Sequence, residues 1–355
     1  INEYKKANAA LEPFAAADIL MPAGKRTLSQ WMKFANSLRL RLAIRVSMSA
    51  PDLARAEVAK AMDATAGGVL ESADETVAVS TESGYKNPLG TVNEGWGEVF
   101  MGATMESVLV GYNDPRLIKY YSKAEGGDIK DEKGNLIIAE RNKIAGTYKG
   151  VPQGTGVTVK DENRYRLHSK STITKQTDAI LMTAAEVWFL RAEAALRGFT
   201  SENVKDCYEK GITVSCQQWG VNVGDYLTSD ATPSDYVDAF EAKYDVKALI
   251  KVTPKWDGGA SPEEQLERIL TQKWIACYPE GYEAWTEQRR TGYPQLFKVF
   301  VNNSGGAIDT NIRIRRLPYP SDIQKNNPTQ YSALKKALGG EDNGGTRLWW
   351  DTGRR

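Results

Sequence analysis

Histidine and cysteine are scarce in this sequence. The 355 residues include one histidine, His168, and three cysteines, Cys207, Cys216 and Cys277. One histidine cannot build a multi-histidine metal site, and the residues around it, RYRLHSKSTI, carry no nucleophile signature. Three sparse cysteines do not make a disulfide framework. We therefore expect free, buried thiols, a structural or surface histidine, and no metal.

A charge excess and a long apolar run are missing as well. Lys and Arg total 46 against 45 Asp and Glu, which excludes the basic excess of a typical nucleic-acid-binding protein. No apolar run approaches the roughly 18 residues of a membrane span. Gly24-Lys25 lacks the upstream glycine of a phosphate-binding loop, and Gly154-Thr-Gly156 lacks the third glycine of a dinucleotide fingerprint. The sequence thus predicts no nucleic-acid partner and no cofactor.

The chain begins at Ile1, without an initiating methionine or a signal peptide. We interpret it as a processed or truncated piece. Any targeting or lipidation signal is then expected upstream of Ile1.

Helical periodicity recurs in adjacent pairs. Residues 27–50 place apolar residues at helical spacing after a cap at Ser29, and Pro51 opens a second helix. The predicted apolar stripe of the first helix is Trp31, Phe34, Ala35, Leu38, Leu42 and Val46. Another pair starts at the capping-box spacing Thr183–Glu186, turns at Gly198 and restarts at Ser201, close to the length of a tetratricopeptide unit. Further helices are predicted from Pro233, from the capping box Ser261–Glu264, over 280–294, and over 329–338.

The middle of the chain is different. Residues 84–156 hold 13 of the 31 glycines, and periodicity there is weak while turn signals are dense. A small hairpin is predicted at Asp131–Asn135 and the LIIA that follows. We expect a loop-rich insert over 84–178 within a single domain of residues 1–355. Irregular excursions from a rigid scaffold commonly carry binding residues.

Residues 280–294, EGYEAWTEQRRTGYP, combine aromatic and charged side chains. Helical spacing places Tyr282, Trp285 and Arg289 on one face and lets Glu287 pair with Arg290. One interpretation is an aromatic platform with an arginine clamp. The other, which we favour from the sequence, is a helix end pinned into the core by the stacked Trp and Arg, with its charges paired.

Seven motifs in order resemble the SusD/RagB-like outer-membrane lipoproteins of Bacteroidota. They are WMKFANSLRLRLAIRVS (31–47), NDPRL (113–117), YKGVPQG (148–154), AEVWFLRAEAALRG (185–198), QKWIACYPEGYEAWTEQRRTGYP (272–294), RIRRLPYP (313–320) and GTRLWWD (345–351). The resemblance implies a mainly all-α fold, a superhelix of tetratricopeptide-like helical pairs with a loop-rich insert and minor β-hairpins. Members of that family carry a signal peptide, a lipidated cysteine and first helices that this chain does not show.

The resemblance also implies a function. Such proteins are lipid-anchored on the extracellular face of the outer membrane, where they bind nutrients without transforming them. The implied partners are a SusC-like TonB-dependent transporter and an oligosaccharide or other small polymeric nutrient, with membrane association only through the N-terminal lipid. A peptide or glycoprotein receptor and a protein–protein scaffold of the same fold stay open as alternatives. A glycosidase is a further alternative, although no carboxylate pair stands out. The resemblance favours a scaffold role for the 280–294 stretch.

Candidate ligand contacts are taken from the insert. Sugar capture needs flat aromatic faces with polar groups at the rim. Trp96, flanked by glycines, fits the first need together with Tyr85, while Asn87 and Asn93 fit the second. Tyr112 is a further candidate. Asp114 and Arg116 are predicted to form a structural ion pair, and Trp349 and Trp350 to attach the C-terminus to the domain.

Overall fold

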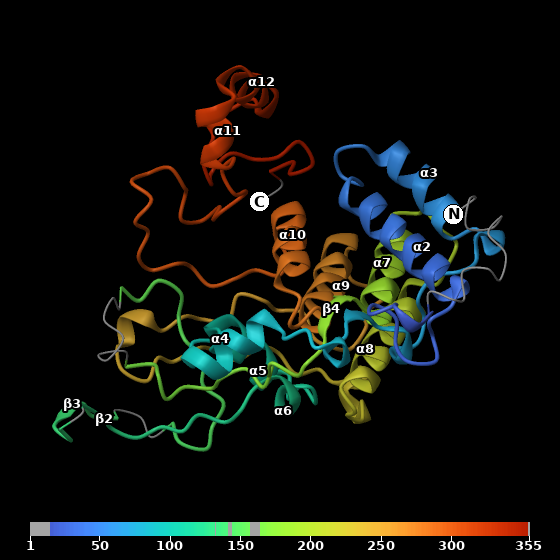
Figure 1. The fold of residues 1–355 in the computed structure, drawn as a ribbon. Coiled ribbons are helices and arrows are strands. Elements are labelled where there is room, and N and C mark those ends of the chain that lie inside the picture. The colour runs from blue at the N-terminus through green and yellow to red at the C-terminus, as the bar shows by residue number, and fades with distance from the viewer. Residues whose placement is uncertain (1–14, 132, 141–143, 157–163, 354–355) are drawn as a thin grey trace.

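The computed structural model describes residues 15–131, 133–140, 144–156 and 164–353. It is mainly helical, as predicted (Figure 1). The helices are α2 (Leu28–Arg45), α3 (Pro51–Ala61), α4 (Pro88–Trp96), α5 (Ala103–Gly111), α6 (Leu117–Tyr120), α7 (Ala184–Leu196), α8 (Val204–Gln218), α9 (Pro262–Ala276), α10 (Gly281–Thr291), α11 (Ser321–Asn326) and α12 (Pro328–Leu338). The strands are β1 (Val77–Val79), β2 (Ile129–Lys130), β3 (Leu136–Ile138) and β4 (Ala179–Met182).

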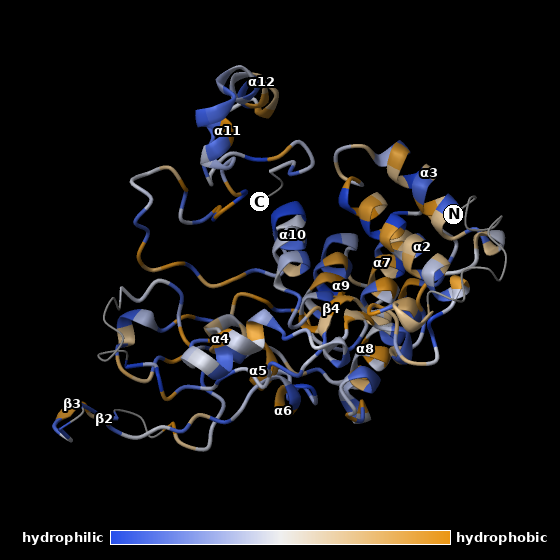
Figure 2. Ribbon diagram, in the orientation of Figure 1, coloured by the Kyte–Doolittle hydropathy of each residue, from blue (hydrophilic) through white to orange (hydrophobic). Residues whose placement is uncertain are grey.

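Helix α7 lies at the centre and packs against α8, α9 and α2. It is buried on nearly all sides, and its alanines let the neighbouring helices approach closely. Gly211 of α8 serves the same purpose, because a Cβ atom there would lie 2.8 Å from the ring of Phe189. Thr183 caps α7 and Gly198 follows its end in the left-handed region, as predicted. Figure 2 shows apolar residues gathered on these central helices.

Helices α2 and α3 form the first predicted pair, but the apolar stripe predicted for α2 is wrong. Leu42 is 52% exposed, whereas Asn36 and Ser37 are buried. Asn36 donates hydrogen bonds to the carbonyls of Ala66 and Gly68 at 2.8 and 2.9 Å. The Asn36 amide nitrogen and the Ser37 hydroxyl therefore have partners, which lowers the cost of burying them. The predicted cap at Ser29 is also wrong, since Thr27 caps the helix.

The segment 84–156 is more regular than its composition predicts. It contains α4, α5 and α6, none of which was predicted. Gly90 of α4 is a packing glycine, because a Cβ atom there would lie 2.1 Å from the backbone of Thr174. We interpreted the high glycine content as a sign of loops, whereas Gly90 is required for close packing of a helix. The predicted hairpin is confirmed as β2 paired antiparallel with β3, and β1 pairs antiparallel with β4.

The helix predicted from Pro233 does not form. Residues Tyr236 and Val246 instead make an antiparallel bridge with N–O distances of 2.9 and 3.0 Å. The carboxylate of Asp238 accepts hydrogen bonds from the backbone of Phe240 and Glu241. Aspartates that bond nearby backbone groups in this way compete with helix formation.

The three cysteines are free and buried, as predicted. His168 is also buried, with its ring against Tyr165 and Phe240 at centroid distances of 5.1 and 5.8 Å. Burial lowers the pKa of His168 from its usual 6.5 to about 4. The histidine is therefore a neutral core residue.

This burial predicts an acid-sensitive fold. The unfolded chain gains a proton on its histidine near pH 6.5 and the folded chain only near pH 4, so the free energy of unfolding falls as the pH drops through that window. Between pH 7 and pH 5 we expect the natural protein to lose about 2 kcal/mol more than a His168→Phe variant. Urea unfolding at both pH values measures the difference, and equal losses would contradict the prediction.

Candidate ligand-binding surface

Three of the five predicted contact residues have structural roles. Asn87 caps α4, accepting from the backbone of Leu89 and Gly90, while its Nδ2 donates to the carbonyl of Thr177 at 3.0 Å. Asn93 donates to the carbonyls of Ser171 and Ile173 at 2.7 and 2.9 Å. These bonds attach α4 to the residues that precede β4.

Tyr112 is a core residue, 1% exposed, and its hydroxyl donates to the carbonyl of Val252. With Asn87 and Asn93 it is removed from our candidate ligand contacts, because its polar group is already satisfied inside the protein.

Trp96 and Tyr85 are exposed, at 63% and 37%. Trp96 is the last residue of α4, and Tyr85 lies two residues before its cap. A nine-residue helix is about 13 Å long, so the two rings do not share one sugar unit. They remain proposed contacts on the surface around α4.

Helix α10 buries its charges and exposes its aromatic residues. Glu283, Glu287 and Arg290 are buried, whereas Tyr282 is 74% exposed and Trp285 is partly exposed. Amphipathic helices normally do the reverse. An exposed aromatic face is informative, because buried charges and exposed large apolar groups are the exceptions that need an explanation.

A buried ionic network holds α10 from behind. Arg290 forms a bidentate pair with Glu193 of α7, with both N–O distances 2.7 Å, and also pairs with Glu287. Lys273 of α9 lies 3.1 Å from Glu283 and 3.4 Å from Glu287. Desolvation opposes their charge, but the surrounding cations dominate and lower the pKa of Glu283 and Glu287. From α2, Arg45 also pairs with Glu283. The pairing of Glu287 with Arg290 confirms the sequence prediction.

The ring of Trp285 is fixed in orientation. Its Nε1 donates to the carbonyl of Ile314 at 3.0 Å, and the guanidinium of Arg289 lies 3.6 Å from its centroid. Arg289 also lies 4.9 Å from the centroid of Trp350. A ring held in this way is preorganised for a ligand.

Two sequence motifs that are distant along the chain contact each other next to Arg289, the residue that packs on Trp285. Arg315 of RIRRLPYP donates to the carbonyl of Arg289 and pairs with Asp351 of GTRLWWD at 2.6 Å. Burial, with the charge of Arg315 adding to it, lowers the pKa of Arg289 to about 10. Arg289 stays charged at neutral pH and keeps its cation–π contact.

Two pockets adjoin along the outward face of α10, and we call them together the α10 groove. The first, about 470 Å³, separates α10 from the start of α4 and includes Pro88, Leu89 and Tyr282. The second, about 600 Å³, lies between α10 and residues 296–314. Gly281 and Trp285 line both pockets, so the two pockets adjoin at the fixed indole.

Amides provide the polar rim of the groove. Gln153, Gln288 and Asn303 line the second pocket. Within the described residues, no hydrogen bond is made by the side chains of Gln288 or Asn303, whereas Gln153 Oε1 accepts from Arg313 at 2.8 Å. Free amides beside an aromatic ring suit hydroxyl-rich or amide-bearing ligands.

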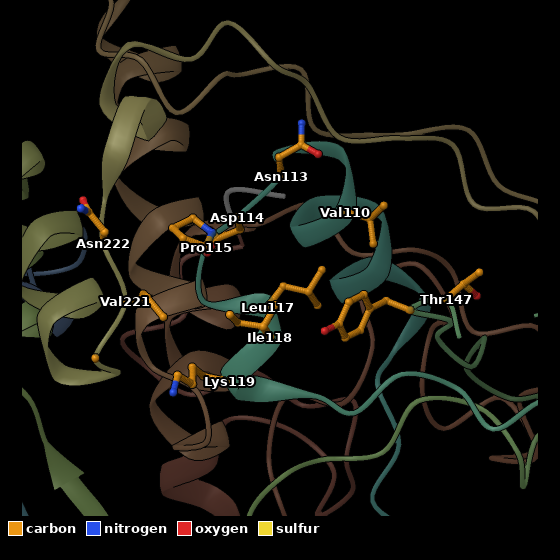
Figure 3. A pocket seen from close by; sticks show the side chains of 12 residues that line it. Val110, Asn113, Asp114, Pro115, Leu117, Ile118, Lys119, Thr147, Val221 and Asn222 are labelled. Carbon is orange, nitrogen blue, oxygen red and sulfur yellow. The ribbon is translucent and has the colours of Figure 1, made fainter. Parts of the chain in front are cut away.

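A third pocket, about 820 Å³, surrounds the NDPRL motif. Asp114 and Arg116 form the predicted buried ion pair beneath it at 2.6 Å. Figure 3 shows Ile118 between Val221 and Val110, and the lining also includes the polar side chains of Asn113, Lys119 and Asn222. Unlike the two pockets of the α10 groove, this pocket has no tryptophan among its described lining residues.

Some features bear on alternatives to ligand binding. No group of three or more His, Cys, Asp or Glu side chains suited to a metal ion occurs in the part of the chain that the structure describes. No helix among the described residues is long and apolar enough to cross a membrane.

Solved structures and a family model resemble this chain, whereas no curated protein matches it. A SusD homologue from Bacteroides vulgatus is 49% identical, with a TM-score of 0.88, over 99% of this chain and 68% of its own. A chitin-binding SusD homologue from Flavobacterium johnsoniae is 35% identical, with a TM-score of 0.87, over 99% and 69%. A SusD homologue from Bacteroides thetaiotaomicron is 32% identical, with a TM-score of 0.83, over 100% and 73%.

The family model, described as Susd and RagB outer membrane lipoprotein, matches residues 2–351. The tetratricopeptide-like helix pairs predicted from the sequence agree with this match. This chain belongs to the SusD-like family of outer membrane lipoproteins.

Proposed function

We propose that this protein captures glycans on the extracellular face of the outer membrane, as a lipid-anchored binding protein and not an enzyme, and passes them to a SusC-like TonB-dependent transporter. The observation that carries the proposal is the reversed amphipathicity of α10, which presents Tyr282 and Trp285 to solvent.

Sugar chemistry fits this surface. A pyranose ring has one face of C–H groups that packs on an aromatic ring, and its hydroxyls need donors and acceptors at the rim. Trp285 offers a fixed ring, and Gln288 lies one turn further along the same helix and lines the same pocket. The 35% identical chitin-binding homologue supports a carbohydrate ligand for this chain as well.

Binding to soluble polysaccharides tests the proposal. We expect calorimetry or affinity electrophoresis to detect saturable binding of at least one glycan class with a Kd between about 1 μM and 1 mM, because an open groove on one helix buries limited area. The glycan should be recovered unchanged, without release of reducing ends. Absence of binding to every glycan of a broad panel, or turnover of a glycan, would contradict the proposal.

A peptide receptor is the second candidate. It is favoured by the aliphatic lining of the NDPRL pocket, where Val110, Ile118 and Val221 suit apolar peptide side chains better than sugar rings. Binding of a peptide pool that is lost on Ile118→Asn, and not on Tyr282→Ala, would support this candidate over the first.

A further inference from the structure

The second pocket of the α10 groove is lined in part by aliphatic side chains, which do not suit sugar hydroxyls. Besides Trp285, five aliphatic side chains line this pocket: Leu296, Val299, Val301, Ile308 and Ile314. A hydroxyl placed against such a wall loses its hydrogen bonds to water and gains none. A methyl group gains from the same contact.

The wall is held in place by the backbone. Phe300 N donates to the carbonyl of Gln153 at 3.0 Å, and the ring of Phe300 packs on Tyr244. Val299 and Val301 line the pocket, whereas Phe300 between them does not. Gly154 permits this approach, because a Cβ atom there would lie 2.8 Å from Val299 Cγ1.

The charged side chains of this pocket, Arg313 and Asp309, bond to neutral groups, and two amides are left available. Arg313 is occupied by Gln153 Oε1 and by the carbonyl of Phe297. The carboxylate of Asp309 accepts from the backbone of Asn311 and Ile312. Gln288 and Asn303 remain available within the described residues. A substituent with one methyl and one amide matches the aliphatic side chains and the two available amides of this pocket.

We infer that the second pocket of the α10 groove binds the acetamido group of an N-acetylated sugar, with the methyl against the valine and isoleucine wall and the amide paired with Gln288 and Asn303. The inference rests on the proposed function and narrows it to glycans that contain N-acetylhexosamine. The first pocket adjoins the second at Gly281 and Trp285, which suits neighbouring units of a linear chain.

Two soluble hexamers with the same β-1,4 backbone test the inference. We expect calorimetry to show the N-acetylglucosamine hexamer binding at least tenfold tighter than the glucose hexamer, because the methyl contact and the amide bonds each contribute to the difference. Val301→Asn and Ile314→Asn should each reduce this ratio below about threefold. Val237→Asn is the matched control, since all three side chains are between 41% and 55% exposed and Val237 lies outside the groove.

The outcomes separate the two proposals. Equal binding of both hexamers overturns the acetamido pocket and leaves glycan capture standing. Binding of some other glycan class but of neither hexamer does the same. Absence of binding to every glycan in the panel overturns the proposed function itself. A ratio that persists in both Val301→Asn and Ile314→Asn, with circular dichroism unchanged, places the discrimination elsewhere and also overturns the inference.

Discussion

Replacing Arg290 with methionine is expected to lower the free energy of unfolding by about 3 kcal/mol. Arg290 is fully buried and joins Glu193 of α7 to Glu287 of its own helix. Without it, both carboxylates stay buried with weaker compensation, since Glu193 keeps only Arg197 and Glu287 keeps Lys273. Uncompensated buried charge is among the costliest single changes. Urea unfolding at pH 7 measures the loss.

Lys247→Met supplies the control for Arg290→Met. Lys247 also makes a 2.6 Å ion pair, with Asp235, but its side chain is exposed, so the expected loss is much smaller than for Arg290→Met. Adding Glu287→Gln to Arg290→Met should recover part of the loss, because one stranded carboxylate becomes neutral. If Arg290→Met and Lys247→Met cost the same, the network does not hold α10 in the way we describe.

Truncating the exposed rings of α10 is expected to have the largest effect on binding. Tyr282→Ala should weaken glycan affinity about tenfold, and Trp285→Ala about a hundredfold, because aromatic anchors contribute roughly 1–3 kcal/mol or more each. Tyr282 is exposed and no hydrogen bond of its hydroxyl occurs among the described residues, so Tyr282→Ala should leave the Tm nearly unchanged. Calorimetry with the best glycan of the panel measures both effects.

Trp96→Ala decides between the two aromatic surfaces. Trp96 is exposed, like Tyr282, but lies at the far end of α4. On our proposal for the α10 groove, Trp96→Ala changes affinity less than threefold. Loss of binding in Trp96→Ala together with normal binding in Tyr282→Ala would move the site to the α4 surface.

The helical frame was predictable because caps and periodicity are local. Thr183 and Ser261 cap their helices as the sequence indicates, and the pairs they begin form the core of the fold. The apolar stripe of α2 was not predictable, since Asn36 and Ser37 are buried through bonds to residues about thirty positions away. Periodicity carries no information about such partners.

In the candidate site, too, local features were predictable and features that depend on distant residues were not. The sequence places Tyr282, Trp285 and Arg289 on one face of a helix, and the contact of Arg289 with Trp285 confirms that geometry. It does not reveal which face is buried, because that depends on Lys273, Glu193 and Arg45 from other helices. We therefore expected the helix to present its aromatic side to the core. One signal in the sequence could have indicated the buried face: the side of the helix away from Tyr282 and Trp285 carries more charged than apolar residues.

The stack of Trp285, Arg289 and Trp350 gives the last residues of the chain an indirect influence on recognition. Trp350 touches Arg289, and Asp351 orients Arg315 against it. Proteolysis or a bulky fusion that displaced these residues would weaken the support of the Trp285 ring. It would change no atom of the proposed sugar contacts. Affinity would then report the integrity of a segment remote from the bound saccharide, and tags for surface display are better placed elsewhere.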